Sequence, residues 1–236
     1  MAIRTAADLI HELDEMTNAQ FESPEFQHLL RLPITPARAQ CYVLHRTHYQ
    51  RHRRDVWAYV QASSPIEVKQ LIWAHEREEL DYDPRADSNH IELGNRECAA
   101  VGLTPEQVEH AALLPGAIAC FWAWVHLAMT RPWLEAFTAP SVMERRNSNE
   151  VVRGGGLSER MARNIAQGLG LPMKRLENST VHMEADVEHG AMLETVVERY
   201  ATTDEARQGV LRGARDSFLI DRAFRAVLAE AMEDLP

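Results

Sequence analysis

The chain has 236 residues and a formal net charge of -10, with 25 lysines and arginines against 35 aspartates and glutamates. An acidic surface repels a phosphate backbone, so we expect no nucleic-acid partner. Hydrophobic residues make up 45% and charged residues 25%, values that exclude wholesale disorder and fibrous repeats. The three cysteines, Cys41, Cys98 and Cys120, show no Cys-x-x-Cys spacing. Their odd number argues against a disulfide framework and a thiolate zinc site and suits a reducing cytoplasm.

Neither a signal peptide nor a membrane span is predicted. Residues 1–14 carry acidic side chains where a signal peptide would be apolar. The most apolar stretch, residues 113–129, is interrupted by Pro115 and His126. It therefore lacks the roughly 18 consecutive apolar residues that indicate a transmembrane helix. We expect a cytoplasmic protein that does not bind a membrane.

Apolar residues recur at i, i+3, i+4 and i+7 through most of the chain, which is the helical period, and no two-residue alternation appears. The pattern predicts an all-α fold. Connections are short, so we expect a single domain over residues 1–236. In chain order the predicted helices cover residues 5–19, a short segment from Ser23-Pro24, 35–61, 64–80, 90–102, a short segment from Thr104-Pro105, 115–137, 143–152, 157–169, 172–200 and 203–235.

Two of these predictions depend on helix-breaking residues. Pro132 is expected to kink the apolar helix over 115–137. The glycines at 154–156 are expected to end the helix over 143–152. Residues 81–89 (DYDPRADSN) have the composition of a loop.

The segment 181–189, VHMEADVEH, carries the sharpest chemical signal. On a helix, His182, Asp186 and His189 are separated by four and three residues, so their side chains project from one face. Two imidazoles and a carboxylate that converge on one point suit non-heme iron or manganese. The bare pattern also occurs by chance on polar helix surfaces, so a metal site requires matching ligands from other helices.

Three other segments offer such ligands. Residues 75–80 (HEREEL) end a predicted helix, His90 opens the next one, and Glu144 follows the tryptophan-rich helix, with Glu150 as its rival. Helical bundles hold di-iron centres with inward-facing carboxylates and histidines from several helices. The sequence therefore contains the parts of such a centre.

This order of residues resembles the heme-oxygenase-like di-iron oxidases and oxygenases. The shared features are a glutamate, a histidine, a lone glutamate in mid-chain and a late His-x-x-x-Asp-x-x-His. The resemblance covers about residues 65–200, and the helix from His90 ends in Gly-hydrophobic-Thr, as in that family. The superfamily also contains pyrroloquinoline quinone synthase-like and thiaminase-type proteins. The resemblance implies a heme-oxygenase-like bundle of about seven core helices.

The resemblance implies two iron ions held by six residues, which would also be the catalytic ones. These are Glu79, His90, Glu144, His182, Asp186 and His189. One iron would take Glu79, His90 and His182 or its neighbour. The other would take Asp186, His189 and Glu144 as a bridge. Which histidine belongs to which iron stays open.

The first carboxylate also stays open, because the gap from Glu79 to His90 is longer than in most of that family. Glu79 is preferred because it stands in a Glu-Leu pair at a helix end. The competing carboxylates are Glu76, Glu78, Asp83 and Asp87.

The resemblance further implies an enzyme that activates O2 at two Fe(II)/Fe(III) ions to oxidise a small amine or amino-acid-derived substrate. The reaction would be N-oxygenation, desaturation or oxidative C–C cleavage. Trp122 or Trp124 would contact the apolar part of the substrate, and Arg145, Arg146 or the arginines among residues 51–54 its carboxylate. An external reductant and a second copy of the chain in a homodimer are the further partners expected.

Two alternatives stay open: a cofactor-free oxidase resembling pyrroloquinoline quinone synthase, and a non-catalytic helical interaction protein with an acidic docking surface. His45, His48 and His52 share a helix face, but arginines surround them. Pocket lining or anion binding is therefore preferred over a second metal site, and a plain solvated face is preferred over both. A thiaminase-type enzyme would need a cysteine nucleophile, and none of the three cysteines stands in a recognisable context.

Overall fold

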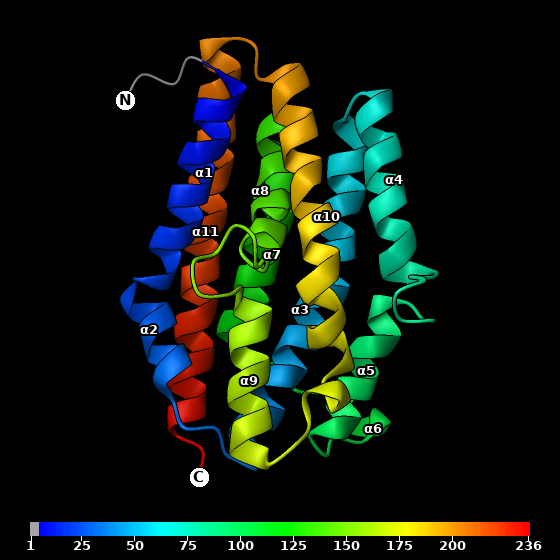
Figure 1. The fold of residues 1–236 in the computed structure, drawn as a ribbon, viewed down its shortest axis with the longest axis vertical. Coiled ribbons are helices and arrows are strands. Elements are labelled where there is room, and N and C mark those ends of the chain that lie inside the picture. The colour runs from blue at the N-terminus through cyan, green and yellow to red at the C-terminus, as the bar shows by residue number, and fades with distance from the viewer. Residues whose placement is uncertain (1–4) are drawn as a thin grey trace.

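Helices joined by short loops make up the structure, a computed structural model that describes residues 5–236 (Figure 1). Besides helix and loop, this part of the chain contains only an isolated bridge between Asp83 and Ser88. The predicted all-α bundle is thus confirmed. Within residues 5–236, no helix is both long and apolar enough to cross a membrane.

Polar caps start the first helices. The side-chain oxygens of Thr5, Ser23 and Thr35 each accept a hydrogen bond from the backbone N–H three residues on. These bonds satisfy N–H groups that a helix leaves without a partner at its start. The helices of the N-terminal half are α1 (Ala6–Phe21), α2 (Pro24–Arg31), α3 (Pro36–Ser63), α4 (Ile66–Leu80), α5 (His90–Ala100) and α6 (Pro105–Glu109). Their positions match the predicted ones closely.

The C-terminal half departs from prediction at one place. The helices are α7 (Pro115–Thr130), α8 (Trp133–Arg145), α9 (Leu157–Leu169), η1 (Met173–Arg175, a 3-10 turn), α10 (Glu177–Tyr200) and α11 (Asp204–Glu233). Pro132 breaks the apolar helix instead of kinking it, because Arg131 before it takes an extended conformation with ψ 154°. The separate helix over 143–152 is therefore wrong: Met143 lies inside α8, and turns follow it.

Those turns end where the chain folds back on itself at Gly156. A Cβ built on Gly156 would lie 1.9 Å from the carbonyl oxygen of Asn147, so no other residue fits this position. Gly154 and Gly155 adopt φ values of 83° and 96°, which favour glycine. This tight return brings the start of α9 against the end of α8.

Two long helices, α3 and α10, frame the centre of the bundle. Both contact α4, α5 and α8, whereas α1, α2 and α11 cover the opposite side (Figure 1). Buried aromatic rings fill the space between α3 and its neighbours. Trp57 of α3 packs against Phe137 of α8 with ring centroids 5.6 Å apart, and Tyr49 packs against Trp124 of α7 at 5.1 Å. This packing fixes α3 and leaves its polar side chains facing α4, α5 and α10.

Candidate metal centre

All six residues that the sequence singled out lie together in the middle of the bundle. They come from α4, α5, α8 and α10, and each is buried, with 7% exposure at most. Side chains that lie within 4.8 Å of one another form two groups of possible metal ligands. We call them subsite 1 (Glu79, His90 and His182) and subsite 2 (His75, Glu144 and His189).

Subsite 1 joins α4, α5 and α10. Oε1 of Glu79 lies 3.1 Å from Nδ1 of His90, and the rings of His90 and His182 are 4.6 Å apart in an edge-to-face arrangement. Nδ1 of His90 has no hydrogen-bond partner, although it is buried. Among the carboxylates of α4, Glu79 is the one that lies in a group with His90 and His182.

Subsite 2 joins α4, α8 and α10. Nε2 of His75 lies 3.1 Å from Oε1 of Glu144, and the rings of His75 and His189 are 4.3 Å apart. His75 is the site residue that the sequence reasoning missed. Its signal was present, because His75 and Glu79 are four residues apart on one helix and therefore share a face.

Asp186 stands between the two subsites. Its Oδ1 lies 3.1 Å from Nδ1 of His182 and 3.8 Å from Nδ1 of His189. Its Oδ2 is buried without a hydrogen-bond partner, as is Oε2 of Glu144. Asp186 thus contacts one histidine of each subsite.

Three further acids lie outside the subsites and hold the outer nitrogens of the histidines. His75 Nδ1 lies 2.9 Å from Glu76, His90 Nε2 lies 2.7 Å from Asp83, and His189 Nε2 lies 2.9 Å from Glu78. A carboxylate on one ring nitrogen places the proton there and leaves the lone pair of the other nitrogen free for a metal. Glu76, Glu78 and Asp83, which competed as ligands in the sequence, thus lie outside both groups and contact their histidines.

Arginines balance the buried carboxylates. Burial alone would raise the pKa of Glu79, but Arg54 and His90 hold that pKa well below its usual range. Burial would likewise raise the pKa of Glu144, and Arg53, whose Nη2 lies 2.5 Å from Oε1, keeps it well below. Both carboxylates are thus ionised at neutral pH and able to bind a cation.

The histidines respond in the opposite direction. Burial alone would lower the pKa of His189, but the neighbouring carboxylates of Asp186 and Glu78 raise it to about 10. The pKa of His90 is also raised, because Glu79 and Asp83 outweigh the effect of burial. Protons on these rings offset the carboxylate charge in the metal-free protein, and a bound metal would replace them.

The donor set fits a metal of the iron type. Each subsite offers imidazole nitrogen and carboxylate oxygen without a thiolate, the combination that suits iron rather than structural zinc. Four buried polar atoms of these residues have no hydrogen-bond partner, namely His90 Nδ1, His189 Nδ1, Glu144 Oε2 and Asp186 Oδ2. Unpaired buried polar groups are costly, so their presence in and beside the two groups of possible ligands points to a cation.

Other candidates from the sequence lie elsewhere. Asp87 is exposed and accepts a hydrogen bond from Tyr82, and Glu150 is exposed in the turns after α8. His45 contacts the backbone of Cys41 and Leu114, so its helix face is buried and its reading as a solvated face is wrong.

The cysteines offer no nucleophile. Cys98 and Cys120 are buried and Cys41 is half-buried, and burial raises the pKa of all three thiols. A thiol with a raised pKa stays protonated and unreactive at neutral pH. None of these three cysteines therefore has the reactive thiol that a thiaminase-type enzyme would need.

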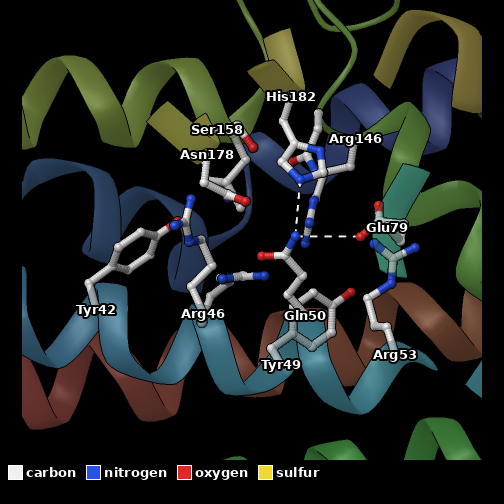
Figure 2. A pocket seen from close by; sticks show the side chains of 13 residues that line it. Tyr42, Arg46, Tyr49, Gln50, Arg53, Glu79, Arg146, Ser158, Asn178 and His182 are labelled. Atoms are coloured by element: carbon white, nitrogen blue, oxygen red, sulfur yellow. Dashed lines mark hydrogen bonds between the residues drawn. The ribbon is translucent and has the colours of Figure 1, made fainter. Parts of the chain in front are cut away.

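Each subsite borders a different space. A cavity of about 40 Å³ lies against Glu79 and His182 of subsite 1 (Figure 2). A surface groove of about 290 Å³ between α4 and α10 borders His75 and His189 of subsite 2.

The side chains expected to bind substrate are only partly in place. Arg53 and Arg146 line the cavity, whereas Arg145 is buried elsewhere and pairs with Asp14 and Glu194. Neither tryptophan that was expected to contact the substrate lines the cavity: Trp124 packs in the aromatic core, and Trp122 is 59% exposed.

Comparison with solved structures supports the fold. A domain of unknown function with a heme oxygenase-like fold from Shewanella denitrificans is 16% identical, with a TM-score of 0.78, and the match covers 98% of this chain and 95% of that one. A CADD-like protein of unknown function from Nostoc punctiforme is 15% identical, with a TM-score of 0.72 and coverage of 96% and 97%. A TenA homolog from Pseudomonas syringae pv. tomato is 10% identical, with a TM-score of 0.64 and coverage of 97% and 92%.

Sequence comparison gives the family. No curated protein matches the chain. A family model described as iron-containing redox enzyme matches residues 40–221, a range that includes both subsites. The heme-oxygenase-like fold and the suspected relationship are thereby confirmed. The chain belongs to the family of iron-containing redox enzymes.

Proposed function

We propose that this protein is a non-heme di-iron enzyme that uses O2 to oxidise a small amine or amino-acid-derived substrate, by N-oxygenation, desaturation or oxidative C–C cleavage. The observation that carries the proposal is the pair of adjacent, buried subsites, each with carboxylate and imidazole donors. Helical bundles hold di-iron centres with this kind of donor set.

In this proposal Glu79, His90 and His182 hold one iron, and His75, Glu144 and His189 hold the other. Asp186 would serve both, because its carboxylate already contacts His182 and His189. Bound iron would supply one-electron redox steps and a position at which O2 can react.

The rest of the chain provides orientation and charge. The acids that bind the outer nitrogens of three histidines fix the direction of each ring. Arg53 and Arg54 keep Glu144 and Glu79 ionised. Because the centre is buried, bulk water is excluded and reactive species are shielded from side reactions.

Metal content and O2 uptake test the proposal together. Anaerobic reconstitution with Fe(II) is expected to leave about two irons per chain, as in other di-iron bundles. Addition of O2 with a reductant and a panel of amines and amino acids should then give substrate-dependent O2 consumption. Protein that retains no iron would support the cofactor-free alternative and overturn the proposal.

Variants separate the enzyme from an interaction protein. His182→Ala and Asp186→Ala are expected to reduce iron content and O2 uptake while circular dichroism shows a helical fold. His126→Ala, at an exposed position of α7, is the matched control and should behave as the wild type. An interaction protein would be indifferent to all three substitutions.

A further inference from the structure

Buried arginines gather around the cavity that borders Glu79 and His182. Side chains of α3 form one wall: Arg46 points toward Asn178, Gln50 toward His182, and Arg53 lies beside Glu79 (Figure 2). Arg146 and Arg225 complete the set, with 2% and 1% exposure. A cavity of about 40 Å³ has room for only a few water molecules, so these guanidinium groups lie close to any occupant.

The four arginines of the cavity are paired unequally with acids, and Glu79, which also lines it, pairs with Arg54 instead. Arg46 pairs with Glu97 at 3.0 Å, and Arg53 pairs with Glu144. Arg146 and Arg225 share one carboxylate, because Nη1 of Arg146 and Nη2 of Arg225 both lie 2.7 Å from Oδ1 of Asp221. This last group carries one positive charge in excess, and an uncompensated buried charge is strongly unfavourable.

Several donors of this cluster have no acceptor. Nε of Arg53, Nε of Arg146 and Nη1 of Arg225 are buried without a hydrogen-bond partner, and so is the hydroxyl of Tyr49. An arginine has only donors, so an oxygen-rich anion is the ligand that satisfies these groups. The planar guanidinium matches the geometry of a carboxylate.

We propose that this cavity is a carboxylate-binding site, formed by Arg53, Arg146 and Arg225, that holds the carboxylate of the substrate beside subsite 1. The site itself follows from the arginine cluster, and its role in holding substrate rests on the proposed function. This site narrows the proposed substrates to molecules with a free carboxylate, such as amino acids. Simple amines are thereby excluded as substrates. The cavity takes the carboxylate group alone, so a larger substrate must widen it.

Thermal unfolding of the metal-free protein tests the site without iron. The protein is titrated with sodium acetate, a small carboxylate, at constant ionic strength. Ethylammonium chloride and sodium phosphate are titrated separately as controls. A saturable rise of the unfolding temperature with acetate, and none with ethylammonium, is expected. The test uses metal-free protein, so a missing acetate shift would not contradict the di-iron proposal. Conversely, a protein that binds no iron after reconstitution could still show the acetate shift.

Arg146→Gln is the informative variant, since Asp221 keeps its partner Arg225 four residues away. It should lose the acetate-dependent shift, whereas Arg153→Gln, at a surface position with 69% side-chain exposure, should keep it. If Arg146→Gln does not fold, Arg146→Lys is used, and about tenfold weaker acetate binding is expected from the lost hydrogen bond. No acetate shift in the wild type, or equal shifts with phosphate that Arg146→Gln leaves intact, would overturn the proposal.

Discussion

Nε2 of His90 lies 2.7 Å from Oδ2 of Asp83, so the carboxylate holds the proton on the nitrogen that points away from subsite 1. The other nitrogen, Nδ1, lies 3.1 Å from Oε1 of Glu79 and is the one that a metal would use. Asp83 is itself fixed by Arg85, whose backbone and side chain both donate to Oδ1. Arg85 also contacts Glu78, the acid that orients His189. One arginine therefore supports the outer acids of both subsites.

Asp83→Asn should weaken metal binding at subsite 1 by about 10- to 100-fold, the usual cost of losing an outer carboxylate. The amide still fills the space, so we expect an unchanged helical content by circular dichroism. Metal titration of the metal-free protein measures the effect. Asp87→Asn, in the same loop but exposed, is the control. Equal affinity in both variants would show that Asp83 does not orient His90.

The sequence predicted the fold and most of the site because local signals coincide with helix ends and helix faces. Thr5 and Thr35 mark helix starts that the structure confirms. The spacing of His182, Asp186 and His189 places all three on one face once the segment is helical. Such features need no knowledge of distant residues.

Features that depend on distant partners could not be predicted. Asp83 reaches His90 only because the loop between them closes through the bridge of Asp83 with Ser88. Arg53 was predicted on a solvated face or in contact with the carboxylate of a substrate, but Glu144, 91 residues further on, pairs with it in the interior. His75 was not predicted as a ligand, because the three glutamates that follow it closely were the candidate ligands of this segment.

His75→Gln tests the residue that the structure adds. We expect iron content to fall from about two to about one per chain, because subsite 1 keeps its three ligands. His126→Gln, at an exposed position of α7, should retain the wild-type content. Elemental analysis after anaerobic reconstitution gives the answer. Two irons in the His75→Gln protein would exclude His75 as a ligand.

Metal loading should stabilise α10, which supplies one histidine to each subsite and Asp186 between them. At a free metal concentration 100-fold above Kd, the gain is about 2.7 kcal/mol, or roughly 5–10 °C in Tm for a chain of this size. Hydrogen exchange should slow most in the middle of α10 and little in α11, which provides no ligand. Asp186→Ala should lose most of the metal-dependent shift. A uniform response across all helices would contradict this prediction.

Acid unfolding should depend on Asp221 of α11. Burial would raise the pKa of Asp221, but Arg146 and Arg225 outweigh it and lower the pKa below the ordinary value of 3.8. The unfolded chain then binds the proton more readily than the folded one, so the contribution of Asp221 to stability is complete above the unfolded pKa. It is lost as the pH falls below 3.8 toward the lower pKa of the folded state.

Asp221→Asn should accordingly lower the free energy of unfolding by about 3–5 kcal/mol at neutral pH, because two buried arginines lose their shared partner. The difference from the wild type should be constant from pH 7 to about pH 5 and shrink below about pH 4. Asp216→Asn, on the same helix with 34% side-chain exposure, should change the free energy by about 1 kcal/mol at most. Urea unfolding between pH 3 and pH 7 measures all three proteins. A difference that grows on acidification would show that Asp221 is protonated in the folded state at neutral pH and that the arginine pair is not held by its charge.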